Sequence, residues 1–140
     1  MNREIKFRLW DERKMHLPEY SEDDNFYLSA DGTPKMILEV GAEGHREAAY
    51  LHGRCILMQF TGLQDKNGVD IYEGDILKAT KYVDWISQVK CIPGAFVVSI
   101  PESIRGVSMM ERVQPLSSFV YEHYEWIVIG NIYDNPELPK

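Results

Sequence analysis

The chain is poor in residues that crosslink proteins or bind metals. Of its 140 residues, only two are cysteines, Cys55 and Cys91, and four are histidines. The cysteines lie far apart, each in an apolar run, so we expect both thiols to be reduced and buried. The cysteines and histidines are scattered rather than grouped at the spacing of a zinc site. We therefore predict a protein without a metal or a cofactor.

Long apolar runs and an excess of basic residues are also absent. No run approaches the roughly 20 residues of a membrane-spanning helix, and residues 1–10 do not resemble a secretory signal. We therefore predict a cytoplasmic protein with no membrane partner. The net charge of −7 disfavours a broad nucleic-acid-binding surface, because such surfaces gather Lys and Arg. A small local basic patch is still compatible with this charge.

The signatures of common enzymes and of calcium loops are missing as well. The sequence has no P-loop, dinucleotide-binding glycine motif, nucleophile elbow or His-Glu-x-x-His motif. A loop starting at Asp65 fails the EF-hand spacing, since Asp70 stands where glycine is needed and Ile76 replaces the bidentate Glu. We therefore predict that the protein is not an enzyme and has no catalytic residue.

The sequence does contain many short alternating or β-branched runs, separated by turn residues. Strand candidates are residues 4–10, 35–40, 55–61, 87–92, 95–100, 116–121 and 124–133. In this interpretation Gly62 ends the run 55–61, and 124–133, the most apolar run, is a central strand. Short strands at this spacing are typical of a small barrel or sandwich. The predicted fold class is mainly β (β-rich α+β at most), with a small SH3-like or partly open barrel in the C-terminal part and an N-terminal β annex.

The domain organisation follows from these runs, since no repeat or low-complexity linker interrupts them. We predict an N-terminal β subdomain, residues 1–54, packed on a barrel-like core, residues 55–140, in one compact unit. Two segments stay open between helix and strand. Within residues 41–54, the part from Glu43 to Leu51 fits two helical turns or an irregular loop. Within residues 102–113, apolar residues three apart fit a short helix as well as a strand.

The stretch from Leu57 to Leu77, LMQFTGLQDKNGVDIYEGDIL, joins two apolar strands through a polar connector. Residues 65–68, Asp-Lys-Asn-Gly, form a strong turn signal, because Asn and Gly both accept positive φ readily. Farther on, Gly74 permits a tight bend, and the carboxylate of Asp75 can accept backbone N–H groups of that bend. The connector is therefore interpreted as a scaffold element.

Two alternative functions can be assigned to residues of this region. In the first, Asp70, Glu73 and Asp75 form the acidic cluster of a hydrolase, although charged turn residues are common and favour a structural role. In the second, a small barrel binds nucleic acid through aromatic and basic side chains on a curved sheet. The candidate binding residues for this second function are Tyr72, Lys78, Lys81, Tyr82, Trp85 and Lys90. The competing interpretation places Trp85 in the core and the lysines in solvent.

Three blocks of the sequence together resemble the YopX family of phage and prophage proteins. The blocks are IKFRLWD near the start, the stretch from Leu57 to Leu77, and VIGNIYDNPEL near the end. The resemblance implies a β-rich protein with a barrel-like C-terminal part, encoded by a phage or prophage and working in the bacterial cytoplasm. It implies no reaction, cofactor or ligand. We therefore expect a non-enzymatic accessory protein that binds a host or phage protein, or assembles into a homo-oligomer that covers its strand edges.

Overall fold

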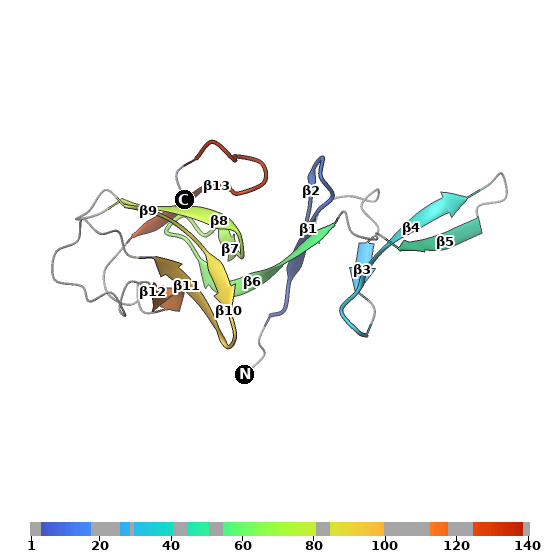
Figure 1. Cartoon of the computed structure of the whole chain (residues 1–140), viewed down its shortest axis with the longest axis horizontal. Coiled ribbons are helices and arrows are strands. Elements are labelled where there is room, and N and C mark those ends of the chain that lie inside the picture. Colours follow the sequence, from blue (N-terminus) through green and yellow to red (C-terminus); the bar gives the residue numbers. More distant parts are fainter. Residues whose placement is uncertain are drawn as a thin grey trace. The chain divides into compact units, whose positions relative to one another are not determined.

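The fold is built almost entirely from β-strands. The computed structural model describes residues 4–17, 26–28, 30–40, 45–50, 55–80, 85–99, 113–117 and 125–138. The strands are β1 (Phe7–Trp10), β2 (Met15–His16), β3 (Phe26–Leu28), β4 (Pro34–Val40), β5 (His45–Tyr50), β6 (Ile56–Gln64), β7 (Asp70–Tyr72), β8 (Asp75–Ala79), β9 (Ile86–Gln88), β10 (Lys90–Ile92), β11 (Ala95–Ser99), β12 (Val113–Pro115) and β13 (Trp126–Asn131) (Figure 1). The predicted fold class, mainly β, is confirmed, and one sheet is curled into half a barrel.

The strands form four sheets within two compact units. The sheet orders are β2-β1-β6-β7, β3-β4-β5, β10-β11-β12 and β13-β8-β9. One unit consists of residues Lys6–Met58, and the other of Met1–Ile5 together with Gln59–Lys140. The boundary falls within β6, so this strand contributes residues to both units. The division predicted from the sequence, residues 1–54 and 55–140, stays a prediction.

The larger unit has a core built around two tryptophans. Trp85 and Trp126 are 2% and 3% exposed, and their rings meet edge to face with centroids 4.9 Å apart. Aromatic pairs favour this arrangement because the positive edge of one ring faces the negative face of the other. The buried residues packed with them are Ile71, Leu77, Ala79, Val89, Val98 and Leu116. This core supports β8, β9 and β11, and β11 lines the site described below.

The smaller unit contains the β1–β2 hairpin, which is closed by one aspartate. Asp11 Oδ1 accepts the backbone N–H groups of Arg13 and Lys14 at 2.9 and 2.8 Å, and Oδ2 lies 2.7 Å from Nε2 of the buried His16. Burial acts to raise the pKa of Asp11, but these hydrogen bonds outweigh it and lower the pKa to about 2. Asp11 is therefore a charged anchor of the turn.

Residues 41–54, for which the sequence allows a helix or an irregular loop, contain a strand. His45–Tyr50 forms β5 and pairs antiparallel with β4 along its whole length, from Val40 opposite His45 to Lys35 opposite Tyr50. The helical and the irregular-loop alternatives are therefore both wrong for the described residues His45–Tyr50. Pairing with β4 outweighs the weak helical propensity of this segment. The sequence alone does not show that β4 lies beside it. Of the other open segment, residues 102–113, the structure describes Val113 alone, at the start of β12, and residues 102–112 lie outside the described residues.

The first strand of the central stretch continues past the glycine that we expected to end it. β6 runs to Gln64, and its pairing with β7 shifts register between Phe60 and Gln64. Gly62 lies within this irregular part with φ of +85°. A glycine at positive φ lets a strand bulge and continue, where another residue would be strained. The prediction that Gly62 ends the strand is therefore wrong.

Two C-terminal expectations also need correction. The apolar run near the C-terminus forms β13, but β8 rather than β13 is the middle strand of the described sheet β13-β8-β9. The register of β13 on β8 shifts between Val128 and Gly130, so this strand is irregular as well. In the predicted strand 116–121, Leu116 and Ser117 have helical backbone geometry, and residues 118–121 lie outside the described residues.

Candidate functional site

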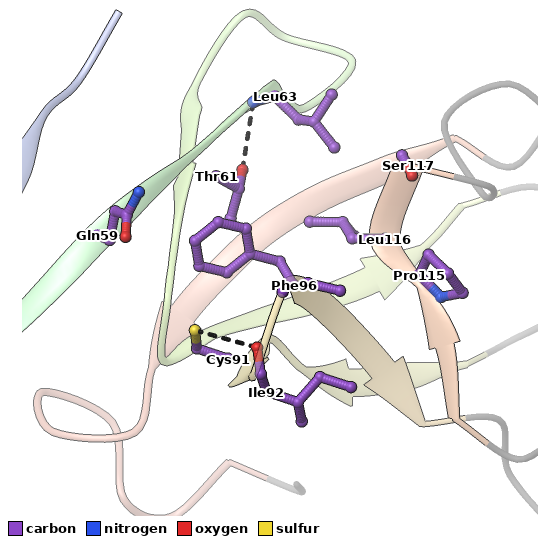
Figure 2. A pocket seen from close by; sticks show the side chains of 11 residues that line it. Gln59, Thr61, Leu63, Cys91, Ile92, Phe96, Pro115, Leu116 and Ser117 are labelled. Carbon is purple, nitrogen blue, oxygen red and sulfur yellow. Dashed lines mark hydrogen bonds between the residues drawn. The ribbon is translucent and has the colours of Figure 1, made fainter.

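A cleft of about 470 Å³ in the larger unit is a candidate site in the described part of the chain. It lies between β6 and the sheet β10-β11-β12, and we call it the β6–β11 cleft (Figure 2). Its lining residues are Gln59, Thr61, Leu63, Cys91, Ile92, Gly94, Ala95, Phe96, Pro115, Leu116 and Ser117. Its volume is in the range of pockets that hold small ligands or single large side chains.

One wall of the cleft comes from alternate residues of β6. Gln59, Thr61 and Leu63 line it because side chains two positions apart lie on the same face of a strand. The Thr61 hydroxyl donates to the carbonyl of Ile71 at 2.8 Å and accepts the N–H of Leu63 at 3.2 Å, so it fixes the irregular part of β6. The half-buried Gln59 side chain has no hydrogen bond within the described part of the chain. Its amide is therefore available to a ligand.

The opposite wall is the β10–β11 hairpin. A two-residue turn, Pro93-Gly94, joins Ile92 to Ala95, and Gly94 has the positive φ, +87°, that a type II turn requires at its second central residue. Cys91 pairs with Phe96, so their side chains lie on the same face of the sheet. Phe96 packs against the core that includes Leu116, and both side chains line the cleft in Figure 2. This wall is therefore rigid and largely apolar.

The lining of the cleft determines what it can bind. The lining residues include no Asp, Glu, Lys, Arg or His, so Cys91 is the one ionisable side chain among them. General acid–base catalysis needs titratable groups close to the reacting atoms, and this lining does not supply a pair. Apolar contacts and the amide of Gln59 suit an uncharged group with few hydrogen-bonding atoms.

Both cysteines are free thiols, but neither is fully buried as we expected. Cys91 is exposed because β10 is an exposed strand, and Cys55 is half-buried. Burial, and then the nearby charges of Asp11 and Glu12, raise the pKa of the Cys55 thiol. A thiol held in its protonated form is a weak nucleophile. The expectation of two buried thiols is therefore wrong, most clearly for Cys91.

None of the three acids of the hydrolase hypothesis lines the cleft. Asp70 Oδ1 accepts a hydrogen bond from the Gln64 amide at 2.9 Å. Asp75 is 1% exposed, and its Oδ2 accepts the backbone N–H of Tyr72 at 2.7 Å. This bond is the turn-stabilising contact that the sequence predicts for Asp75. The hydrolytic role of these acids stays a prediction.

The turn formed by Glu73 and Gly74 is bonded through its backbone to three other segments of the larger unit. Glu73 N–H donates to the carbonyl of Gln59 at 2.9 Å, and Gly74 N–H donates to the carbonyl of Val89 at 2.9 Å. The carbonyl of Gly74 accepts the N–H of Ile132 at 3.0 Å. The turn therefore holds β6 close to the segment that leads into β10, and so fixes one end of the β6–β11 cleft.

The residues proposed for nucleic-acid binding lie in different environments. Tyr72 is 5% exposed, and the centroid of its ring lies 5.5 Å from that of Phe60. Trp85 is buried, and its Nε1 donates to the carbonyl of Ser99 at 3.0 Å. Lys78 is half-buried and Lys90 is exposed. Lys81 and Tyr82 lie outside the described residues. The structure thus places both described aromatic rings in the interior, away from the solvent that surrounds Lys90.

The described residues hold neither a cluster of metal ligands nor a helix that could cross a membrane. No three His, Cys, Asp or Glu side chains there gather in a way that could hold a metal ion. In the same residues, no helix is long and apolar enough to cross a membrane.

The cleft could not be predicted from the sequence. The alternation of Gln59, Thr61 and Leu63 indicates a shared face, but the face opposite comes from Phe96, more than thirty residues later. No local pattern connects the two walls, because the contact depends on how the strands curl in space.

Comparisons with known proteins identify the family. The family model described as YopX protein matches residues 6–140. The chain belongs to the YopX family. The resemblance predicted from the three sequence blocks is therefore confirmed. A comparison with curated proteins finds no match.

Two crystal structures have the same fold. Protein yopX from Bacillus subtilis matches with a TM-score of 0.66 and 24% identity, over 96% of this chain and 98% of that chain. Protein EF1440 from Enterococcus faecalis matches with a TM-score of 0.57 and 25% identity, over 99% of this chain and all of that chain. At such low identity the likeness shows the fold and carries no activity over to this YopX-family protein.

Proposed function

We propose that this YopX-family protein is a non-enzymatic binding module, encoded by a phage or prophage, that binds a host or phage protein in the bacterial cytoplasm. The observation that carries the proposal is the β6–β11 cleft, whose lining combines apolar side chains with the free amide of Gln59 and has no charged group. Family membership supports the phage or prophage origin. Family membership does not indicate a ligand, so the kind of ligand is inferred from the lining of the cleft.

The cleft favours binding because its walls are already fixed. Thr61 is held by two hydrogen bonds, and the β10–β11 hairpin is paired along its length. A site that is formed before the ligand arrives loses less conformational entropy on binding. The apolar floor, formed by Phe96 and Leu116, would take a large uncharged side chain out of water.

The test measures whether the cleft takes up a neutral apolar group, with indole as the probe. Indole titrated into isotope-labelled protein should shift the amide NMR signals of Gln59, Cys91 and Phe96 in a saturable manner. Saturation at millimolar indole, with shifts confined to the lining, would support the proposal. An absence of shifts, or shifts that spread over unrelated surfaces, would contradict it.

Two exposed aliphatic residues provide a matched pair of variants. Ile92 is 43% exposed and lines the cleft, whereas Val69 is 48% exposed and lies in the β6–β7 loop, outside the lining. Ile92→Asp should weaken indole binding by about tenfold, because it brings a charge to an apolar rim. Val69→Asp should leave binding unchanged. Equal effects of the two variants would show that the cleft is not the binding site.

A further inference from the structure

We infer that the natural ligand of the β6–β11 cleft is an extended peptide segment of another protein, which pairs with β10 at Cys91 and inserts a large uncharged apolar side chain into the cleft. This inference rests on the proposed function and specifies its partner. The inference rests on the backbone of β10, where some N–H and C=O groups point toward β11 and others point away from it.

The register of the hairpin fixes where the backbone of Cys91 points. Ile92 and Ala95 flank the two-residue turn, so they form a hydrogen-bonded pair, and the next pair, Cys91 and Phe96, is a non-hydrogen-bonded pair. The N–H and C=O groups of Cys91 therefore point away from β11. In the described sheet β10 has no other neighbour, and no described backbone group bonds to Cys91 on that side.

The same edge already forms hydrogen bonds at Val89, two residues before Cys91. Val89 N–H donates to the carbonyl of Asp75 at 2.8 Å, and the Val89 carbonyl accepts the N–H of Gly74 at 2.9 Å. Residues two apart in a strand direct their backbone groups to the same side. Among the described residues, the edge is thus occupied at Val89 by the start of β8 and open at Cys91, where an added strand would continue the ladder.

An added strand would also aim a side chain into the cleft. Its residue opposite Cys91, which we call position X, would have its side chain on the same face as Cys91 and Phe96. Both of these residues line the cleft. A leucine, methionine or aromatic side chain at X would contact Phe96 and Leu116, and a charged one would be excluded by the uncharged lining.

A second copy of this chain fits the site poorly. If β10 of a second copy paired around Cys91, position X would be Cys91 of that copy, whose small side chain would leave most of the 470 Å³ empty. Each copy also carries a net charge of −7, so two copies repel each other. The site therefore favours a segment of another protein.

A displayed library of random heptapeptides, selected on the full-length protein, supplies the probe. We expect the selected peptides to share one large apolar residue and to compete with indole for the cleft. The tightest peptide is then synthesised with an N-methyl group either at X or at the following residue. We expect the added strand to run antiparallel to β10, as β8 runs antiparallel to β9. In that pairing the N–H of X donates to the Cys91 carbonyl, so N-methylation at X should weaken binding by about tenfold, whereas the following N–H points away and its methylation should change affinity less than about twofold.

The outcomes separate this inference from the proposed function. Equal affinities of the two N-methylated peptides, or an absence of selected peptides while indole still binds the cleft, would overturn the inference and leave the proposed function standing. A failure of both indole and peptides to bind would overturn both. A light-scattering mass of twice the monomer that falls to the monomer in Ile92→Asp would show that a second copy occupies the site, and would also overturn the inference.

Discussion

The carboxylate of Asp65 accepts a hydrogen bond from the backbone N–H of Val128 at 3.0 Å, across 63 positions of sequence. The other oxygen of the same carboxylate accepts the N–H groups of Asn67 and Val69 at 2.8 and 3.0 Å. Asp65 is 8% exposed. One side chain in the family-like central stretch therefore closes the β6–β7 loop and attaches that loop to β13.

This arrangement predicts graded effects of substitutions at Asp65. Asp65→Ala removes the acceptor of three backbone N–H groups and should lower the free energy of unfolding by about 2–3 kcal/mol. Asp65→Asn keeps one oxygen for the loop but turns an N–H₂ group toward the N–H of Val128, so it should cost about 1–2 kcal/mol. Urea denaturation followed by tryptophan fluorescence measures both. An asparagine variant as stable as the wild type would show that the bond to Val128 contributes nothing.

Gly130 and Gly94 should respond differently to alanine. A Cβ at Gly130 would lie 2.8 Å from Asn135 Cγ and 2.8 Å from Leu138 Cδ1, so Gly130→Ala must shift these two side chains of the 131–138 loop and should cost about 1–3 kcal/mol. A Cβ at Gly94 would meet no atom within 4 Å. Because φ is +87° there, Gly94→Ala should still cost about 1 kcal/mol of backbone strain.

Amide hydrogen exchange distinguishes these two glycine variants. Exchange of residues 131–138 should rise in Gly130→Ala and remain unchanged in Gly94→Ala. The reverse pattern, or a larger loss of stability in Gly94→Ala, would contradict the close approach at Gly130.

The turns of this protein could be predicted from sequence because their chemistry is local. Asp75 accepts the N–H of Tyr72 as the sequence suggests, and the loop after β6 turns at Asp65. In that loop the positive φ falls on Gly68 alone, and Asn67 does not share it. A residue within four positions of its partner leaves a recognisable signature.

The ends of strands and the candidate site could not be predicted, because they depend on distant partners. Whether Gly62 ends β6 or lets it bulge is decided by the pairing with β7. Likewise, His45–Tyr50 is a strand because β4 lies beside it. The cleft needs β6 and β11 to face each other, and the exposure of Cys91 follows from the edge position of β10.

Trp85 provides a test of whether an aromatic residue in the nucleic-acid hypothesis serves the core. Trp85→Ala removes the contact with Trp126 and the hydrogen bond to Ser99, and should cost about 3–5 kcal/mol. Lys90→Ala, at an exposed side chain, should stay within about 0.5 kcal/mol of the wild type. Thermal unfolding measures both variants. If Trp85→Ala were as stable as the wild type, the ring would be free to stack on bases, and gel shifts with single- and double-stranded DNA and RNA would then decide its role.

The anchor at Asp11 predicts a loss of stability in acid. Its pKa is lowered from 3.8 to about 2 in the folded protein. A carboxyl whose pKa is lower in the folded state stabilises that state fully above pH 3.8, and this contribution is lost as the pH falls toward 2. Because the side chain is partly exposed, we expect no more than about 2 kcal/mol. The difference in unfolding free energy between wild type and Asp11→Asn should shrink over this pH range.

Carboxyl-carbon NMR gives the direct measurement at Asp11. Its signal should titrate with a midpoint of about 2. In His16→Gln the contact at Oδ2 is weakened while the N–H groups of Arg13 and Lys14 still reach Oδ1, so the midpoint should move part of the way back toward 3.8. A wild-type midpoint at or above 3.8 would show that burial outweighs these hydrogen bonds, and the hairpin would then gain no stability from the charge of Asp11.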